Sequence, residues 1–138
     1  MGGADDVNVL ILGSTGNLGP HVVKALEAEH VLRLADIATP GETDHEFVNV
    51  DVSDLDQVVS AAEGMEAIVN LSVLRHDRRL AFDVSARGAY NMMAAAVEHG
   101  IPRVINTGPH FTITGPSYER FDHGIAPDVP AQPGTNLY

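Results

Sequence analysis

Residues 7–26, VNVLILGSTGNLGPHVVKAL, decide the fold. They open with a nearly continuous apolar run over residues 7–12, which is typical of a strand buried on both faces of a parallel sheet. Glycines at positions 13, 16 and 19 follow at once, and a helical pattern covers residues 17–29. A bare backbone between a buried strand and a helix allows a tight turn and leaves helix-terminal N–H groups open to a pyrophosphate. The stretch therefore predicts a dinucleotide-binding turn or, as the alternative, a tight turn that holds no ligand.

Strands and helices alternate along the rest of the chain. A charged connector at residues 75–79 precedes the longest helix, and Gly100 ends that helix. This alternation indicates an open α/β sheet with right-handed crossovers and hence parallel strands, a Rossmann-type doubly wound sheet with helices on both faces. The predicted strands cover residues 7–12, 31–37, 47–52, 67–71 and 103–107, and the predicted helices run over residues 17–29, from the N-cap Ser53 to Glu63, and over residues 80–99.

Composition narrows the class of function. The 138 residues are 44% hydrophobic and carry a formal net charge of -11, which repels phosphate backbones and anionic lipid and argues against nucleic-acid or membrane partners. There is no cysteine, so neither a disulfide framework nor a thiolate nucleophile is available. Residues 1–6 are polar, and no apolar run approaches the roughly 20 residues of a membrane span. We therefore expect a cytoplasmic protein.

Residues 108–138 differ from the preceding chain. They are rich in Gly and Pro and carry no strand or helix pattern. A loop of this length is uncommon in a compact domain unless it is functional or disordered. We therefore expect a dinucleotide-binding Rossmann core over residues 1–107 and an irregular active-site or substrate loop over residues 108–138 of the same domain.

Asp36 ends the second predicted strand, roughly 20 residues beyond the glycines, where an acidic residue meets the ribose of a dinucleotide. A carboxylate at this place accepts hydrogen bonds from the 2′-hydroxyl and repels a 2′-phosphate, which favours NAD over NADP. Arg33 lies earlier on the same strand, and we expect it to face a different environment. The alternative is that Asp36 is a solvated strand terminus.

The ends of the third and fourth predicted strands extend the candidate site. Asp51 is placed to accept from the adenine amino group while Val52 backs the ring, although Asp51 is also placed simply to precede the Ser53 cap. Residues 70–73 end the fourth strand at the carboxyl edge, where ligands bind in these sheets. A nicotinamide ribose belongs there if the cofactor crosses the point at which the strand order reverses.

The glycine-rich turn supplies the remaining candidates. Asn17 and Leu18 are expected closest to the phosphates, and Ser14 and Thr15 are expected to add hydroxyl donors. The predicted cofactor-binding residues are Gly13, Ser14, Thr15, Gly16, Asn17, Leu18, Gly19, Asp36, Ile37, Asp51, Val52, Leu71, Ser72 and Val73.

Other chemistries have little support. Seven histidines are scattered without H-x-x-x-H or H-E-x-x-H spacing, so no metal site is predicted. The sequence has no G-x-S-x-G elbow of a hydrolase, and GSTGNLG lacks the G-K-[ST] ending of a P-loop.

Several segments together resemble the extended short-chain dehydrogenase/reductase family, which contains sugar-nucleotide epimerases, dehydratases and sugar dehydrogenases. Within that family, LRLADI (32–37) and the tail over residues 110–138 most resemble the NAD-dependent uronate dehydrogenases. The resemblance covers nearly the whole chain and implies a sugar or sugar-acid substrate and homodimer contacts through the helix over residues 80–99. The segments that carry it are GSTGNLG (13–19), LADI (34–37), VDVSDLD (50–56), AIVNLSV (67–73) and FDVSARGAYNMMAAAVEHGIPRVINT (82–107).

The resemblance also implies catalytic residues. The family places a catalytic Tyr four residues before a Lys, and Tyr138 matches that tyrosine, whose tyrosinate acts as general base toward a substrate hydroxyl. The Lys is absent from this sequence, so we expect the chain by itself to be a poor catalyst. The family also has a Ser/Thr pair after the fifth strand, for which Thr107 is the first candidate and Thr112 the second. Ser85 stands where the family often has Asn, which leaves a proton relay unassigned.

The sequence thus predicts the NAD-binding portion of a sugar-active oxidoreductase that transfers a hydride from a sugar hydroxyl carbon to NAD. Two alternatives stay open. One is an NAD-dependent sugar-nucleotide epimerase or dehydratase, since this fold supports several chemistries. The other is a non-catalytic dinucleotide-binding module or an inert fragment.

Overall fold

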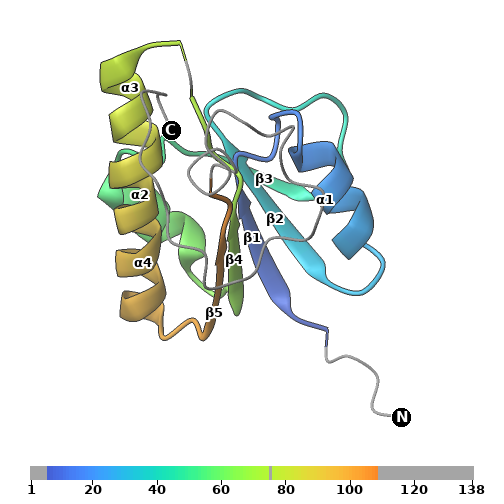
Figure 1. The fold of residues 1–138 in the computed structure, drawn as a ribbon. Coiled ribbons are helices and arrows are strands. Elements are labelled where there is room, and N and C mark those ends of the chain that lie inside the picture. Colours follow the sequence, from blue (N-terminus) through green and yellow to red (C-terminus); the bar gives the residue numbers. More distant parts are fainter. Residues whose placement is uncertain (1–5, 75, 109–138) are drawn as a thin grey trace, which may run out of the picture.

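The computed structural model describes residues 6–74 and 76–108 (Figure 1). Their elements are β1 (Asn8–Leu12), α1 (Gly19–Leu26), β2 (Val31–Asp36), β3 (Glu46–Asn49), α2 (Leu55–Ala62), β4 (Ala67–Asn70), α3 (Arg78–Phe82), a π-helical turn η1 (Asp83–Arg87), α4 (Gly88–His99) and β5 (Arg103–Asn106). The strands form one parallel sheet in the order β3-β2-β1-β4-β5. The chain therefore builds outward from β1 in one direction and then crosses back to build from β4 in the other. This confirms the predicted α/β class with a parallel sheet.

The hydrophobic core lies on both faces of the sheet. On one face, α2 and α4 contribute Val58 and Met92 to a cluster with Leu10. On the other face, α1 packs Val23 against a second cluster that contains Ile11. Figure 1 shows α1 on one side of the sheet and α2 and α4 on the other. Alternate residues of β1 thus enter opposite clusters, which explains the continuous apolar run over residues 7–12.

The region between β3 and α2 departs from the prediction. β3 ends at Asn49, so the prediction that Asp51 and Val52 end this strand is wrong. The N-cap of α2 is Asp54, whose Oδ1 accepts from the N–H of Gln57 at 3.2 Å, in place of the predicted Ser53. Ser and Asp are both strong N-cap residues, so adjacent candidates in S-D compete and the sequence alone does not separate them.

The helix predicted over residues 80–99 begins two residues earlier. Asp77 caps α3 by accepting from the N–H of Leu80 at 2.9 Å, and the helix continues through η1 into α4. It ends at Gly100, whose φ of 66° is the left-handed conformation that favours glycine at a helix end, as predicted. The π turn was not predicted. Single π turns carry little local sequence signal and are frequent near functional sites.

The close approach of α4 to the sheet depends on Gly88. A Cβ built at Gly88 would lie 2.9 Å from Cγ2 of Val52. The buried residues of α4 recur at the three- and four-residue spacing of one helix face. The start of α4 is thereby packed directly against the turn that follows β3.

Within residues 6–74 and 76–108, no helix has the length and apolar character needed to cross a membrane. Of the region predicted to be irregular, only residue 108 is described. The candidate residues Thr112 and Tyr138 lie outside the described residues.

Candidate functional site

The glycine-rich turn lies where the strand order reverses. β1 and β4 are neighbours in the sheet, with Leu12 paired to Asn70, so the residues after both strands meet at the carboxyl edge. The N–H of Leu71 donates to the carbonyl oxygen of Leu12 at 2.8 Å. In open α/β sheets ligands bind in the crevice at this point. The fold therefore places the predicted turn at the edge where a cofactor is expected.

The three glycines of the turn differ in what a side chain at each position would meet. Gly13 has φ +77°, and a Cβ there would lie 2.6 Å from the backbone nitrogen of Ser72. A Cβ at Gly19 would overlap the carbonyl group of Ser14. At Gly16 the closest atom to a Cβ is the carbonyl oxygen of Gly13, at the ordinary contact distance of 3.5 Å. The fold thus requires Gly13 and Gly19, whereas the bare backbone at Gly16 leaves space on the outside of the turn that a methyl group would fill.

The N-terminus of α1 is open to an anion. Asn17 and Leu18 are exposed, and Leu18 occupies the N-cap position without a side-chain cap hydrogen bond. Pro20 stands in the first turn of the helix, where its missing N–H costs nothing. N–H groups that lack an intrahelical partner and the positive end of the helix dipole favour a negatively charged group here. The turn and the helix end together fit a pyrophosphate.

Asp36 lies beside this turn. Its Oδ2 accepts from the N–H of Thr15 at 3.0 Å, and its Oδ1 accepts from the N–H of Ala38 at 3.2 Å. The carboxylate thus ties β2 to the glycine-rich turn, and its role toward a ribose stays a prediction. Each carboxylate oxygen can accept a second hydrogen bond. The side chain thus retains acceptor capacity for the hydroxyls of a ribose.

Ser14 holds the turn in place. Its side chain is buried, and its Oγ donates to the carbonyl oxygen of Ala35 at 3.3 Å. The N–H groups of Gly13 and Ser14 donate to the same oxygen at 2.8 and 3.2 Å. The structure therefore corrects the prediction of a hydroxyl donor for phosphate at Ser14, since this hydroxyl is committed to the backbone of β2.

Arg33 points to the opposite edge of the sheet. Its Nη1 donates to the carbonyl oxygens of Ala61 and Glu63, both at 2.8 Å, and so caps the C-terminus of α2. Its Nε lies 2.9 Å from Oε2 of Glu46, a close ion pair without the alignment of a hydrogen bond. The prediction that Arg33 and Asp36 occupy different environments is confirmed.

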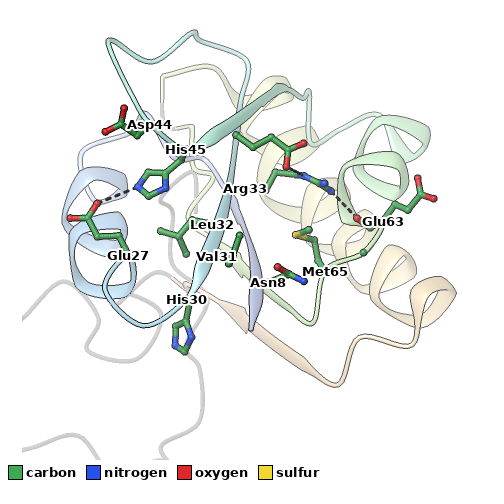
Figure 2. Close-up of a pocket in the computed structure, with 12 residues that line it drawn as sticks. Asn8, Glu27, His30, Val31, Leu32, Arg33, Asp44, His45, Glu63 and Met65 are labelled. Atoms are coloured by element: carbon green, nitrogen blue, oxygen red, sulfur yellow. Dashed lines mark hydrogen bonds and ion pairs between the residues drawn. The ribbon is translucent and has the colours of Figure 1, made fainter. Parts of the chain in front are cut away.

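A cavity of about 500 Å³ lies at this opposite edge (Figure 2). It is lined by residues at the starts of β1, β2 and β3, among them Asn8 and Arg33. Two close side-chain pairs lie there: Nε of Arg33 is 2.9 Å from Oε2 of Glu46, and Nε2 of His45 is 3.2 Å from Oε2 of Glu27. The cavity is therefore separate from the carboxyl edge that holds the glycine-rich turn.

Asn70 joins the ends of β4 and β5. Its side chain is 3% exposed; Nδ2 donates to Oδ1 of Asn106 at 2.8 Å, and Oδ1 accepts from the N–H of Ser72 at 3.1 Å. Both the N–H and the Oγ1 of Thr107 donate to the carbonyl oxygen of Asn70, at 3.1 and 2.9 Å. The hydroxyl proton of the catalytic candidate Thr107 is thus engaged with the backbone, and the oxygen keeps its acceptor capacity.

Asp51 and Val52, which were predicted to contact the adenine, differ in exposure. Oδ1 of Asp51 accepts from the N–H and Oγ of Ser53, at 2.9 and 2.7 Å. Asp51 is exposed and each carboxylate oxygen can accept a further hydrogen bond, so its contact with the adenine amino group stays a prediction. Val52 is 6% exposed and belongs to the core cluster on α4, because the chain turns inward after β3 ends. Its side chain is therefore a packing residue and has little surface left for an adenine ring.

Two further asparagines were missed by the sequence reasoning. Asn91, buried on α4, donates through Nδ2 to the carbonyl oxygen of Val52 at 2.9 Å. Asn49 donates through Nδ2 to the carbonyl oxygens of Asp36 and Ile37, at 3.2 and 2.9 Å. An amide on the apolar face of an alanine-rich helix was a usable signal for Asn91. Nothing in the sequence near Asn49 indicates its partners.

The structure therefore gathers most of the predicted cofactor residues at one edge of the sheet. Ser14, Asn70 and Asn91 are buried and hydrogen-bonded there, so this edge is held by internal polar contacts. Buried polar groups destabilise a fold unless they are paired, as these are. Among residues 6–74 and 76–108, no group of three His, Cys, Asp or Glu side chains is placed to hold a metal ion.

Solved structures of dehydrogenases are similar to this chain in fold and sequence. The uronate dehydrogenase from Agrobacterium tumefaciens is 28% identical with a TM-score of 0.77, over 94% of this chain and 50% of that one. A variant of that enzyme was solved as a complex with NAD. A short-chain dehydrogenase/reductase superfamily protein from Agrobacterium tumefaciens with bound NAD is 25% identical with a TM-score of 0.79, over 93% of this chain and 40% of that one.

One curated protein is also similar to this chain in sequence. Sterol demethylase protein B of Methylococcus capsulatus (strain Bath) is 28% identical over 141 residues, which cover 94% of this chain and 42% of that protein. The chain thus spans half or less of the length of these relatives.

A family described as NAD(P)H-binding matches residues 13–117, well over half of the chain. The match contains the glycine-rich turn and Asp36. The predicted short-chain dehydrogenase/reductase-like fold and nicotinamide dinucleotide cofactor are thereby confirmed. The chain belongs to this NAD(P)H-binding family.

Proposed function

We propose that this chain is the NAD-binding part of an oxidoreductase that transfers a hydride from a sugar hydroxyl carbon to NAD. The observation that carries the proposal is the carboxylate of Asp36, 3.0 Å from the N–H of Thr15 inside the glycine-rich turn. The similarity to uronate dehydrogenases of known structure supports a uronic acid as the substrate. Because the chain spans about half of those enzymes, the substrate is a proposal for the whole protein.

The preference for NAD over NADP follows from the charges near Asp36. A 2′-phosphate bound beside this carboxylate would meet a like charge, which costs about 1 kcal/mol in water and about 4 kcal/mol at an effective dielectric constant of 20 for charges 4 Å apart. Arg33 is engaged with Ala61, Glu63 and Glu46 at the other edge and does not offset that charge. We expect NADP to bind at least about tenfold more weakly than NAD.

NAD, when bound, supplies the hydride acceptor. The backbone around Gly16 and the N-terminus of α1 would bind its pyrophosphate. Asp36 would accept from the adenine ribose, with the exposed side chain of Ile37 beside the adenine. Ser72 and Val73, which follow β4, would contact the nicotinamide ribose.

The catalytic residues are proposed from the family resemblance. Tyr138 would remove the proton of the substrate hydroxyl, and Thr107 or Thr112 would hydrogen-bond the same oxygen. Thr107 would act as an acceptor while its hydroxyl continues to donate to the carbonyl oxygen of Asn70. A donor role for Thr107 would require that hydrogen bond to break.

Turnover tests the reaction. A chain extended past Tyr138 so that a Lys stands four residues later is mixed with NAD and a uronic acid, and NADH formation is followed by absorbance. We expect oxidation that is lost in Tyr138→Phe. Interconversion of a sugar nucleotide without net NADH would favour the epimerase alternative, and saturable NAD binding without any turnover would favour the non-catalytic module.

We further propose that a second copy of the chain packs along α3 and α4. Phe82, Tyr90, Met93 and Val97 are all at least 50% exposed along this helix. Sedimentation equilibrium should give a dimer, and Tyr90→Glu with Val97→Glu should give a monomer. A monomeric parent chain would contradict this proposal.

The cytoplasmic location stays a prediction from the sequence.

A further inference from the structure

Asn49 is the last residue of β3 and is paired in register with Asp36 of the neighbouring strand β2. Its Nδ2 donates to the carbonyl oxygen of Asp36 at 3.2 Å and to that of Ile37 at 2.9 Å. The N–H of Val50 donates to the same Asp36 oxygen at 3.0 Å. At the last pair of the ladder, the backbone at residues 36–37 thus accepts three hydrogen bonds from Asn49 and Val50, two of them from the side chain of Asn49.

The segment held in this way carries two side chains of the candidate site. The carboxylate of Asp36 is oriented by the N–H groups of Thr15 and Ala38, and the second of these belongs to the turn that Asn49 anchors. Ile37 is 65% exposed, although it directly follows a strand with buried apolar residues. The position of both groups therefore depends on the backbone conformation at residues 36–38.

The chemistry of the amide suits this task. One Asn nitrogen carries two N–H groups and can serve two carbonyl oxygens at once. An aspartate of the same shape would place an oxygen against both carbonyls and would repel them. Asn49 is itself exposed, so its hydrogen bonds compete with water and contribute little to global stability.

We propose that Asn49 is a positioning residue for the adenosine half of NAD. Its amide fixes the backbone at residues 36–37 so that the carboxylate of Asp36 meets the ribose hydroxyls and the side chain of Ile37 lies beside the adenine. Asn49 acts through these two residues and does not itself touch the cofactor. This inference rests on the proposed role of Asp36.

The test measures binding of NAD and NADP by calorimetry to the 138-residue chain and its variants. Asn49→Ala should weaken NAD binding about fivefold, the size expected for lost exposed hydrogen bonds. NADP binding should fall less than NAD binding, because the NADP complex depends on the position of Ile37 but gains little from Asp36. The NAD preference should therefore fall, a result that a general loss of stability would not produce. Asn49→Thr, which keeps good strand propensity, should repeat the effect.

Two controls separate the possible failures. Asn8→Ala removes the same amide at the opposite edge of the sheet and should leave both affinities unchanged. In an Asp36→Ala background, Asn49→Ala should cost less NAD affinity than in the parent chain, since only its effect through Ile37 remains. Unchanged NAD affinity in both Asn49 variants, or the same loss with and without Asp36, would overturn the inference. Unchanged NAD affinity in Asp36→Ala would instead overturn the role proposed for Asp36.

Discussion

Alanine at Gly16 and alanine at Gly19 should have opposite consequences for folding and binding. At Gly16 the new Cβ meets no atom closer than 3.5 Å, and φ lies outside the positive region that strains a side chain. Gly16→Ala should therefore leave the free energy of unfolding within about 1 kcal/mol of the parent, with a slight gain expected from the restricted unfolded chain. At Gly19 the Cβ overlaps the carbonyl group of Ser14, and backbone atoms must move to admit it.

The size of the Gly19 effect follows from its neighbour. Overpacking commonly costs about 1–3 kcal/mol, and a clash with backbone belongs at the upper end of that range. At about 4 °C per kcal/mol for a domain of this size, Gly19→Ala should lower Tm by about 10 °C, and Gly16→Ala should change it by less than about 4 °C. Both Tm values are measured by circular dichroism on the ligand-free chain.

For NAD affinity, the informative variant is Gly16→Ala, because its fold should be intact. In Gly16→Ala the added methyl group takes the space on the outside of the turn, so NAD affinity should fall at least about tenfold in calorimetry while the fold is intact. Parent-like NAD affinity in Gly16→Ala would refute the claim that Gly16 faces the pyrophosphate. A Tm loss in Gly16→Ala equal to that in Gly19→Ala would refute the claim that Gly19 is needed for the fold and Gly16 for the ligand.

Three further predictions concern single side chains. Asp36→Ala should weaken NAD binding about tenfold in calorimetry and reduce the discrimination against NADP; an unchanged preference would contradict the electrostatic explanation. Asn91→Leu leaves the buried carbonyl oxygen of Val52 without its 2.9 Å donor, and it should lower the unfolding free energy in urea by about 1–3 kcal/mol; unchanged stability would show that this hydrogen bond contributes nothing. Arg33→Met removes the two carbonyl contacts at the end of α2 and should cost about 1–3 kcal/mol with NAD affinity unchanged; a shift in NAD preference would place Arg33 in the cofactor site.

The order of elements could be predicted because local patterns and packing agree. The apolar run of β1 marks the central strand, since its alternate residues enter both core clusters. Gly100 ends the long helix in the left-handed conformation that its residue type favours. The apolar run and the helix end both depend on residues that are close together in the sequence.

The rest could not be predicted because it depends on contacts between distant segments. The different roles of Gly13 and Gly16 arise from the backbone of Ser72, which reaches the turn only through the pairing of β1 and β4. Val52 enters the core because Gly88 of α4 packs on it. The partners of Asn49 lie on another strand. The sequence therefore predicts which edge of the sheet carries the candidate site, whereas the contacts of each residue within it depend on the fold.

The central claim is that the carboxyl edge of this sheet binds NAD through the glycine-rich turn and Asp36. Calorimetric titration of the 138-residue chain with NAD and with NADP tests it most directly. We predict saturable binding of one NAD per chain and a preference of at least about tenfold over NADP. Absence of NAD binding at millimolar concentration, or tighter binding of NADP than of NAD, would contradict the claim.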